Sequence, residues 1–392
     1  MSPRLDPSWL DDVDALSRRD PSAMLRLVAG SGAQVREASV AAADAGVKRL
    51  SAEGRPRAVV VAGVGGSGIS GDVLAAVAGP NSPVPVVVHR GYDLPMWVGA
   101  ADVVIGVSCS GTTEETLSAV EQAAHRGCAL VGVGAADSPL ADLVGRSRGI
   151  HVPVPPGRMP RASLWALSVP LLLAGAALDI LTLDESDLAA AADRLDEIAE
   201  RCRPTSESFV NPAKQLAIEL SDSLPLVWGS SHLAGVAAYR MTCQLAENAK
   251  YPAICGVIPE ANHNQVVVFD GPYGTGMAAD AAVANHDLTD DVGTDFFRDR
   301  SEDDEPARLR LVILRDPVEH PRVARRREAS RELAEGRGIE VSELIGEGAS
   351  PVERLASLIG LPDFASVYLA LLAGIDPTPV AAIGELKTRI LT

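Results

Sequence analysis

The chain has 392 residues, of which 47% are hydrophobic and 4% aromatic, and its 52 acidic against 35 basic residues leave a net charge of −17. This length allows two domains, and a core built from Ala, Val and Leu favours helices packed on parallel sheets. Nucleic acid and anionic membranes are disfavoured as partners, because they carry the same sign of charge. Any site for an anion must therefore be local, made of oriented amides and hydroxyls.

The cysteines and the apolar runs of the sequence indicate the cellular compartment of the protein. The five cysteines are scattered and lack C-x-x-C spacing, which predicts reduced thiols in the cytoplasm, with no metal site. The N-terminus lacks an apolar signal segment, and the most apolar run, residues 164–183, is interrupted by Ser168, Pro170 and Asp179. We expect a soluble cytoplasmic protein that does not enter a membrane.

Strand and helix patterns alternate along the chain. Apolar positions at helical spacing predict helices in residues 4–55, at 162–178, at 183–203, at 232–249 and, with a Pro-rich break at 376–379, at 351–392. Short apolar runs rich in β-branched residues predict strands from Val59 and at 84–88, 101–108, 129–134, 149–154, 224–228, 308–314 and 338–341. Such alternation is typical of βαβ units in a parallel sheet.

These elements predict an α/β fold of two doubly wound subdomains, each with a parallel sheet flanked by helices. The limits expected are an N-terminal helical segment at 1–54, a first subdomain at 55–182, a linker helix at 183–204 and a second subdomain at 205–392. The acids, glycine and few apolar residues of 287–305 predict a surface loop.

The strand at Val59 runs into a glycine-rich segment, 63–71, that opens a helix. Glycine permits a close approach of the backbone, and the first amides of a helix point outward at the positive end of its dipole. Such a turn binds anions, most often phosphate, and Ser67 and Ser70 can add hydroxyl donors.

The same segment fits a dinucleotide fingerprint, Gly63-x-Gly65-x-x-Gly68, with Arg90 and Asp93 near the place of a ribose or 2′-phosphate partner. A nicotinamide-dependent oxidoreductase is therefore an alternative at this point. A Gly-Lys-Ser/Thr sequence is missing, which excludes a nucleotide triphosphatase P-loop.

A second loop crowds hydroxyls between a strand end and a helix start, at Ser108, Ser110, Thr112 and Thr113. A lone cluster of this kind usually caps a helix. Two such loops can meet at the carboxyl edge of one sheet, where open α/β sheets bind ligands. A dinucleotide needs only one of them, whereas a compact phosphomonoester can use both.

These loops, Gly65-Gly-Ser-Gly-Ile-Ser-Gly71 and Ser108-Cys-Ser-Gly-Thr-Thr-Glu-Glu-Thr116, resemble the phosphosugar loops of the sugar isomerase (SIS) fold. Four later motifs narrow the resemblance to the bifunctional phosphoglucose/phosphomannose isomerases of archaea and bacteria. They are Pro156-Gly-Arg-Met-Pro-Arg161-Ala, Glu247-Asn-Ala-Lys-Tyr-Pro-Ala, Pro259-Glu-Ala-Asn-His263-Asn and Leu386-Lys387. The resemblance covers residues 55–392.

The resemblance implies a reaction and a set of residues. Glucose 6-phosphate, and mannose 6-phosphate, would interconvert with fructose 6-phosphate through a cis-enediol and without a cofactor. Glu247 matches the base that moves the proton between C1 and C2, His263 and Lys387 match the pair that opens the ring, and Arg161 matches the cation at the enediol oxygens. The phosphate would be held by Gly66, Ser67, Ser108, Ser110 and Thr113.

The resemblance also implies a homodimer in which His263 reaches the site of the other subunit. A non-catalytic sugar-phosphate sensor stays an alternative, although the complete set of matching residues argues against it. Two positions depart from the family pattern: Thr112 replaces a usual Asn, and Val380 replaces a threonine that accommodates both C2 epimers.

Overall fold

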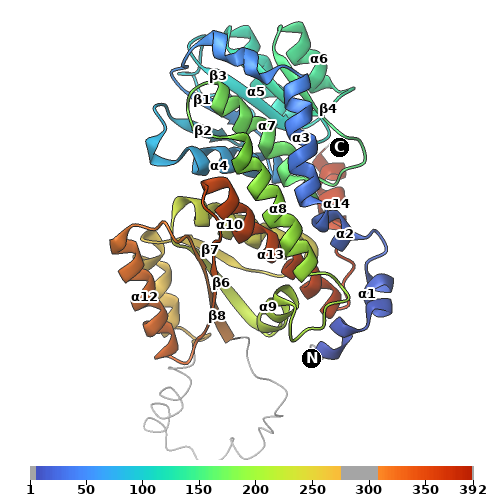
Figure 1. Ribbon diagram of the computed structural model, residues 1–392, viewed down its shortest axis with the longest axis vertical. Helices are drawn as coiled ribbons and strands as arrows, with labels where there is room; N and C mark the ends of the chain where they lie inside the picture. The colour runs from blue at the N-terminus through green and yellow to red at the C-terminus, as the bar shows by residue number, and fades with distance from the viewer. Residues whose placement is uncertain (1–5, 275–307, 391–392) are drawn as a thin grey trace, which may run out of the picture. The chain divides into compact units, whose positions relative to one another are not determined.

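The computed structural model describes residues 6–274 and 308–390 (Figure 1). The chain divides into two compact units. We call Arg26–Glu200 with Glu347–Gly360 the N-terminal sheet unit, and Met1–Leu25 with Arg201–Gly346 and Leu361–Thr392 the C-terminal sheet unit. The domain limits predicted from the sequence stay a prediction, and the acidic loop predicted at 287–305 lies outside the described residues.

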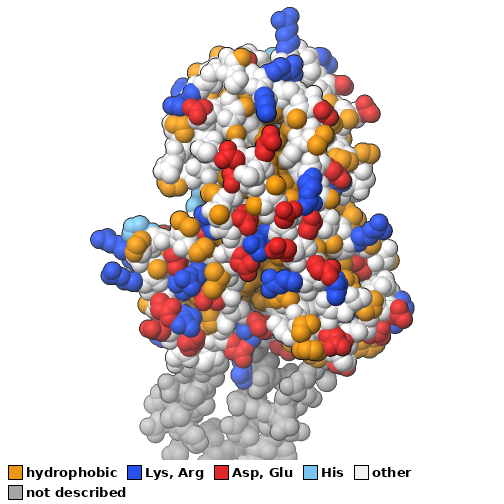
Figure 2. Space-filling view, viewed as in Figure 1, with side chains coloured by type: hydrophobic (Ala, Val, Ile, Leu, Met, Phe, Trp, Pro, Cys, Tyr) orange, Lys and Arg blue, Asp and Glu red, His pale blue; other side chains and the backbone are white. Residues whose placement is uncertain are grey.

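Charges of both signs are mixed on the face of the protein seen in Figure 2. The described residues include exposed ion pairs, such as Arg36 with Asp193 at 2.7 Å and with Asp196 at 2.8 Å. Exposed pairs of this kind contribute only about 0–1 kcal/mol each. An anionic ligand therefore meets mixed local charge on this face and not a basic field.

The N-terminal sheet unit contains a parallel five-stranded sheet in the order β2-β1-β3-β4-β5. Its strands are β1 Val59–Ala62, β2 Val86–His89, β3 Val103–Ser108, β4 Ala129–Ala135 and β5 Ile150–Val154. β1 and β3 are buried along their whole length, as expected for strands covered on both faces. The strand order reverses between β1 and β3, which is where open α/β sheets bind ligands.

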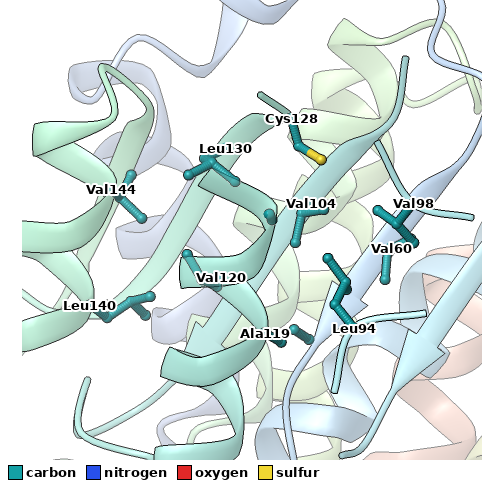
Figure 3. Close-up of a cluster of buried hydrophobic side chains, with 12 residues drawn as sticks. Val60, Leu94, Val98, Val104, Ala119, Val120, Cys128, Leu130, Leu140 and Val144 are labelled. Atoms are coloured by element: carbon teal, nitrogen blue, oxygen red, sulfur yellow. The ribbon is translucent and has the colours of Figure 1, made fainter. Parts of the chain in front are cut away.

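Helices cover this sheet, namely α3 Ser31–Asp44, α4 Gly66–Ala78, α5 Glu114–His125, α6 Pro139–Arg146 and α7 Leu164–Ala177, while α8 Glu185–Arg201 belongs to the same unit as far as Glu200. α7 is apolar on all sides and packs against α3 and α4. Val60 and Val104 of the strands meet Val120 of α5 and Leu140 of α6 in a buried cluster (Figure 3). The sheet and its helices thus share one aliphatic core, as the composition predicts.

The C-terminal sheet unit holds a parallel four-stranded sheet in the order β7-β6-β8-β9. Its strands are β6 Ser223–Gly229, β7 Ile254–Val257, β8 Arg308–Arg315 and β9 Glu340–Ile345. Trp228 of β6 stacks on Phe269 with ring centres 5.7 Å apart in the core of this unit. Two parallel sheets flanked by helices confirm the predicted α/β fold class.

The helices of this unit include α1 Val13–Arg19, α9 Pro212–Leu220, α10 His232–Gln244, α12 Pro321–Glu335 and α14 Ala381–Ile390, while α2 Met24–Ala29 and α13 Pro351–Leu372 have residues in both units. Two details differ from the sequence prediction. The helix expected at 232–249 is α-helical only to Gln244 and continues as a π turn, Leu245–Ala249. Strand β7 was not predicted, because four residues including one glycine are too short for a clear pattern.

One helix in the described part of the chain, α13, is long and apolar enough to cross a membrane by length and composition. However, 89% of its most apolar 18-residue window is buried inside the protein, so those two criteria are weak evidence for a span. The apolar run at residues 164–183 forms α7 only as far as Ala177, which makes it too short for the same length criterion.

A buried lysine ties the segments of the C-terminal sheet unit together. The side chain of Lys214 is 0% exposed, and its Nζ donates to the carbonyl oxygens of Pro204 at 2.9 Å and Ser206 at 2.7 Å. It also lies 3.4 Å from a carboxylate oxygen of Asp11 and 5.6 Å from the ring centre of Tyr368. Burial lowers the pKa of Lys214, and the neighbouring Asp11 carboxylate opposes that shift.

We expect Lys214→Met to destabilise the protein, because the methionine keeps the apolar stem but leaves two partly buried carbonyl groups without their donor. An unsatisfied buried acceptor costs about 1–3 kcal/mol, so the free energy of unfolding in urea should fall by about 3 kcal/mol. Lys48→Met is the control, since Lys48 is exposed and its substitution should change stability by less than about 0.5 kcal/mol. Equal urea midpoints for the two variants would contradict the structural role of Lys214.

Candidate functional site

The first glycine loop joins β1 to α4 through backbone that only glycine fits. Gly65, the N-cap residue of α4, has a φ of +56° in the left-handed region. A Cβ on Gly66 would lie 3.3 Å from the carbonyl oxygen of Pro160, and a Cβ on Gly68 would lie 2.8 Å from that of Gly63. Gly65 has no side chain that could cap the helix. The amides of Gly66 and Ser67, at the positive end of the α4 dipole, therefore receive no hydrogen bond from an N-cap side chain.

The second loop joins β3 to α5 and gathers four hydroxyl groups. Ser108 is fully buried, its Oγ lies 2.8 Å from Thr113 Oγ1, and it accepts a hydrogen bond from the Thr113 amide at 3.4 Å. Ser110 Oγ lies 2.9 Å from Thr112 Oγ1. Thr113 occupies the N-cap position of α5 but makes no side-chain cap bond, so its hydroxyl serves the cluster and not the helix.

A third segment, residues 155–163, contacts both loops. The Pro160 carbonyl stands beside Gly66, and the thiol of Cys109 in the second loop lies 3.9 Å from the carbonyl oxygen of Arg158. Arg161 follows in the short 3-10 turn Pro160–Ala162 and is only 7% exposed. The N-terminal sheet unit thus carries six predicted site residues on these three segments, namely Gly66, Ser67, Ser108, Ser110, Thr113 and Arg161.

The other three predicted residues belong to the C-terminal sheet unit and lie on separate elements. Glu247 is half-buried in the π turn that follows α10. His263 is exposed and ends the 3-10 turn Glu260–Asn262. Lys387 is exposed on α14, a helix with no buried residue between Ala381 and Ile390. Their roles stay predictions.

Sequence analysis missed one residue that supports the arginine segment. Gln34 of α3 is 2% exposed, and its Nε2 donates to the carbonyl oxygen of Ala162, the residue after Arg161, at 2.8 Å. Its Oε1 accepts from the Ala166 amide at 3.4 Å, so one side chain spans the turn and the start of α7. The only signal in the sequence was a glutamine among the small and apolar residues of α3.

Burial limits the reactivity of two cysteine thiols, Cys109 and Cys255. Burial raises the pKa of Cys109, against an opposing effect of Arg158, which keeps this group a thiol and a poor nucleophile. Burial likewise raises the pKa of Cys255 to about 11. Within residues 6–274 and 308–390, no three His, Cys, Asp or Glu side chains gather in a way that could hold a metal ion.

The two sheets and their loops define the class of α/β proteins with the SIS-type fold. The structure is similar to that of hypothetical protein TT0462 from Thermus thermophilus, with a TM-score of 0.65, 18% identity and 99% of both chains covered, which bears on the fold alone. Residues 209–390 match the family model described as bacterial phospho-glucose isomerase C-terminal SIS domain.

Two relatives extend the similarity along most of the chain. The bifunctional phosphoglucose/phosphomannose isomerase of Caldicellulosiruptor bescii is 31% identical over 332 residues, which is 85% of this chain and 89% of that protein. The protein of the same name from Aquifex aeolicus is 28% identical over 336 residues, 85% of this chain and 90% of that one. The chain therefore belongs to the family of bifunctional phosphoglucose/phosphomannose isomerases.

We expect the second loop to bind phosphate through its hydroxyl groups. Ser110→Ala should therefore weaken the affinity for inorganic phosphate, as measured by calorimetry. A hydrogen bond to a charged group contributes about 1.5–3 kcal/mol, which corresponds to a rise in Kd of about tenfold or more. Ser147→Ala is the control, because Ser147 is exposed at the end of α6 and outside the three segments. The same Kd in both variants would remove Ser110 from the site.

Proposed function

We propose that the protein interconverts glucose 6-phosphate and mannose 6-phosphate with fructose 6-phosphate. The observation that carries this proposal is the meeting of two amide- and hydroxyl-rich loops and a buried arginine, Arg161, in one unit of a chain of this family. A dinucleotide would need only the first loop, and family membership further favours the isomerase over the oxidoreductase.

The phosphate group would anchor the sugar. Amides of Gly66 and Ser67 at the start of α4 and hydroxyls of the second loop supply donors that suit a dianion. In a chain of net charge −17, such neutral, oriented groups bind phosphate without long-range attraction. The anchored end then leaves C1 and C2 of the open-chain sugar for the reacting groups.

Glu247 is the proposed base of the reaction. It removes the proton from C2 of the aldose and returns a proton to C1, while a second proton passes from O2 to O1, which yields the ketose through a cis-enediol. Arg161 is proposed to stabilise the negative charge on the enediol oxygens. Glucose and mannose 6-phosphates differ only at C2 and share this enediol, so one base can serve both epimers.

His263 and Lys387 are proposed to open the sugar ring by moving protons at O5 and O1. The exposure of His263 supports the further proposal that, in a cytoplasmic homodimer, this residue acts in the site of the other subunit. Oligomers of identical subunits are usually closed dimers, in which such an exchange is reciprocal.

We expect the wild-type protein, with EDTA present, to form both glucose 6-phosphate and mannose 6-phosphate from fructose 6-phosphate, each followed by its own coupled assay. Glu247→Gln removes the base but keeps the shape, so kcat for both products should fall by about 10²–10⁴-fold. Substrate affinity in calorimetry should stay within about threefold, because the phosphate groups provide most of the binding.

Glu121→Gln is the matched control, since Glu121 is an exposed acid of α5 outside the site. Tight binding of fructose 6-phosphate without turnover in the wild type would overturn the isomerase and identify a sugar-phosphate sensor. The ratio of the two products measures the preference between the C2 epimers. Val380 bears on this preference, because it stands where the family has a threonine that accommodates both epimers.

A further inference from the structure

Glu247 lies where the backbone changes from an α-helix to a π turn. α10 ends at Gln244, and Leu245–Ala249 form a π turn that closes with the Lys250 amide donating to the Leu245 carbonyl. Lys250 itself has a φ of +55°, which is uncommon for a residue with a side chain. π turns are rare and are frequent at functional sites, and strained backbone persists only where neighbouring contacts hold it. The contacts around this turn therefore matter for Glu247.

A ladder of buried polar groups holds the helix on one side of the turn. Arg240 donates to Asp363 of α13 from Nε at 3.0 Å and from Nη2 at 2.7 Å, and Gln244 adds a bond to the same carboxylate at 3.3 Å. Beyond the π turn, Asn248 Nδ2 donates to Ser366 Oγ at 2.9 Å. These five side chains are 0–4% exposed, and buried polar bonds are costly to leave unmade, so the ladder fixes α10 against α13.

Lys250, an exposed residue, bonds to the C-terminal end of the π turn. Its Nζ donates to the carbonyl oxygen of Glu247 at 2.8 Å and to that of Asn248 at 3.3 Å. The same Nζ lies 3.4 Å and 3.5 Å from the carbonyl oxygens of Asp376 and Pro377, respectively. The last carbonyl groups of a helix lack intrahelical donors and form the negative end of its dipole. The ammonium group therefore satisfies two such carbonyls and joins the turn to the segment before α14.

We propose that Lys250 is a positioning residue that holds the π turn and thereby orients Glu247; this inference rests on the proposed function of Glu247 as the base. Without the ammonium, the carbonyl group of Glu247 regains a donor, the Tyr251 amide that now bonds to Leu245, if the turn relaxes toward α-helical register. The Asn248 carbonyl gains none in that register, because the residue four positions on is Pro252, which has no N–H. A change of register by one residue rotates a helical side chain by about 100°. Because the ladder keeps α10 in place, this displacement stays local to Glu247 and leaves the fold intact.

The test is Lys250→Met, compared with Lys250→Arg and with the control Lys48→Met. A misplacement of about 1 Å at a reacting group costs about 10²-fold, so kcat of the methionine variant should fall by about 30–100-fold for both aldoses, with KM within about threefold. KM should hold because the phosphate loops belong to the other unit. The arginine variant keeps donors for carbonyl oxygens and should stay within about tenfold of the wild-type kcat.

The outcomes separate this inference from the proposed function. An active wild type with an equally active Lys250→Met overturns the inference alone, and so does a rise in KM at constant kcat, which would make Lys250 a substrate contact. Equal losses in the methionine and arginine variants also overturn it. If the methionine variant melts below the assay temperature, the arginine variant decides, because rescue requires the donors. A wild type without isomerase turnover overturns the proposed function and this inference together.

Discussion

The close approach of backbone to backbone at the glycines of the first loop is the constraint on which the candidate phosphate site depends. A side chain on Gly68 would meet the Gly63 carbonyl at 2.8 Å, and one on Gly66 would meet the Pro160 carbonyl at 3.3 Å. Because Gly68 leaves no room for a side chain and Gly66 leaves little, α4 starts soon after the end of β1 and the Pro160 carbonyl lies against its first turn. A larger residue at Gly66 would require the Pro160 carbonyl to move by a few tenths of an ångström.

The candidate phosphate site of the N-terminal sheet unit depends on local dipoles and not on the net charge of the protein. The protein carries a net charge of −17, yet its candidate site for a dianion is built from amides, hydroxyls and a single buried arginine. Fixed dipoles act at short range and are little affected by the overall charge, whereas a surface field would have the wrong sign here. Gln34 completes the arrangement by fixing the turn of Arg161 from the sheet-covering helix α3.

The C-terminal sheet unit uses buried polar groups in a different way. Arg240, Gln244 and Asn248 bond to α13, and Lys214 bonds to backbone carbonyls in the same unit. Apolar packing alone allows a helix to slide or turn, whereas each of these bonds has one partner and one direction. The bonds of Gln244 and Asn248 to α13 flank the π turn at Glu247, a backbone geometry that is rare in helices.

Much of the architecture could be predicted from the sequence, because periodicity, β-branched runs and glycine turns act locally. The strand from Val59, the hydroxyl cluster from Ser108 and the motifs around Arg161 and Glu247 all follow from short stretches of chain. Strand β7 escaped prediction because it is short, and the π turn did so because residues 240, 244 and 248 keep ordinary helical spacing.

The sequence by itself thus determined most of the helices and strands, the α/β fold class and the residue types available for chemistry. Only the tertiary structure decided that Pro160 lies at Gly66, that Gln34 supports the Arg161 turn, and that Asn248 bonds to Ser366. The physical reason is distance along the chain, since Asn248 and Ser366 are 118 positions apart. Such contacts form when whole helices and strands pack, and no local pattern specifies them.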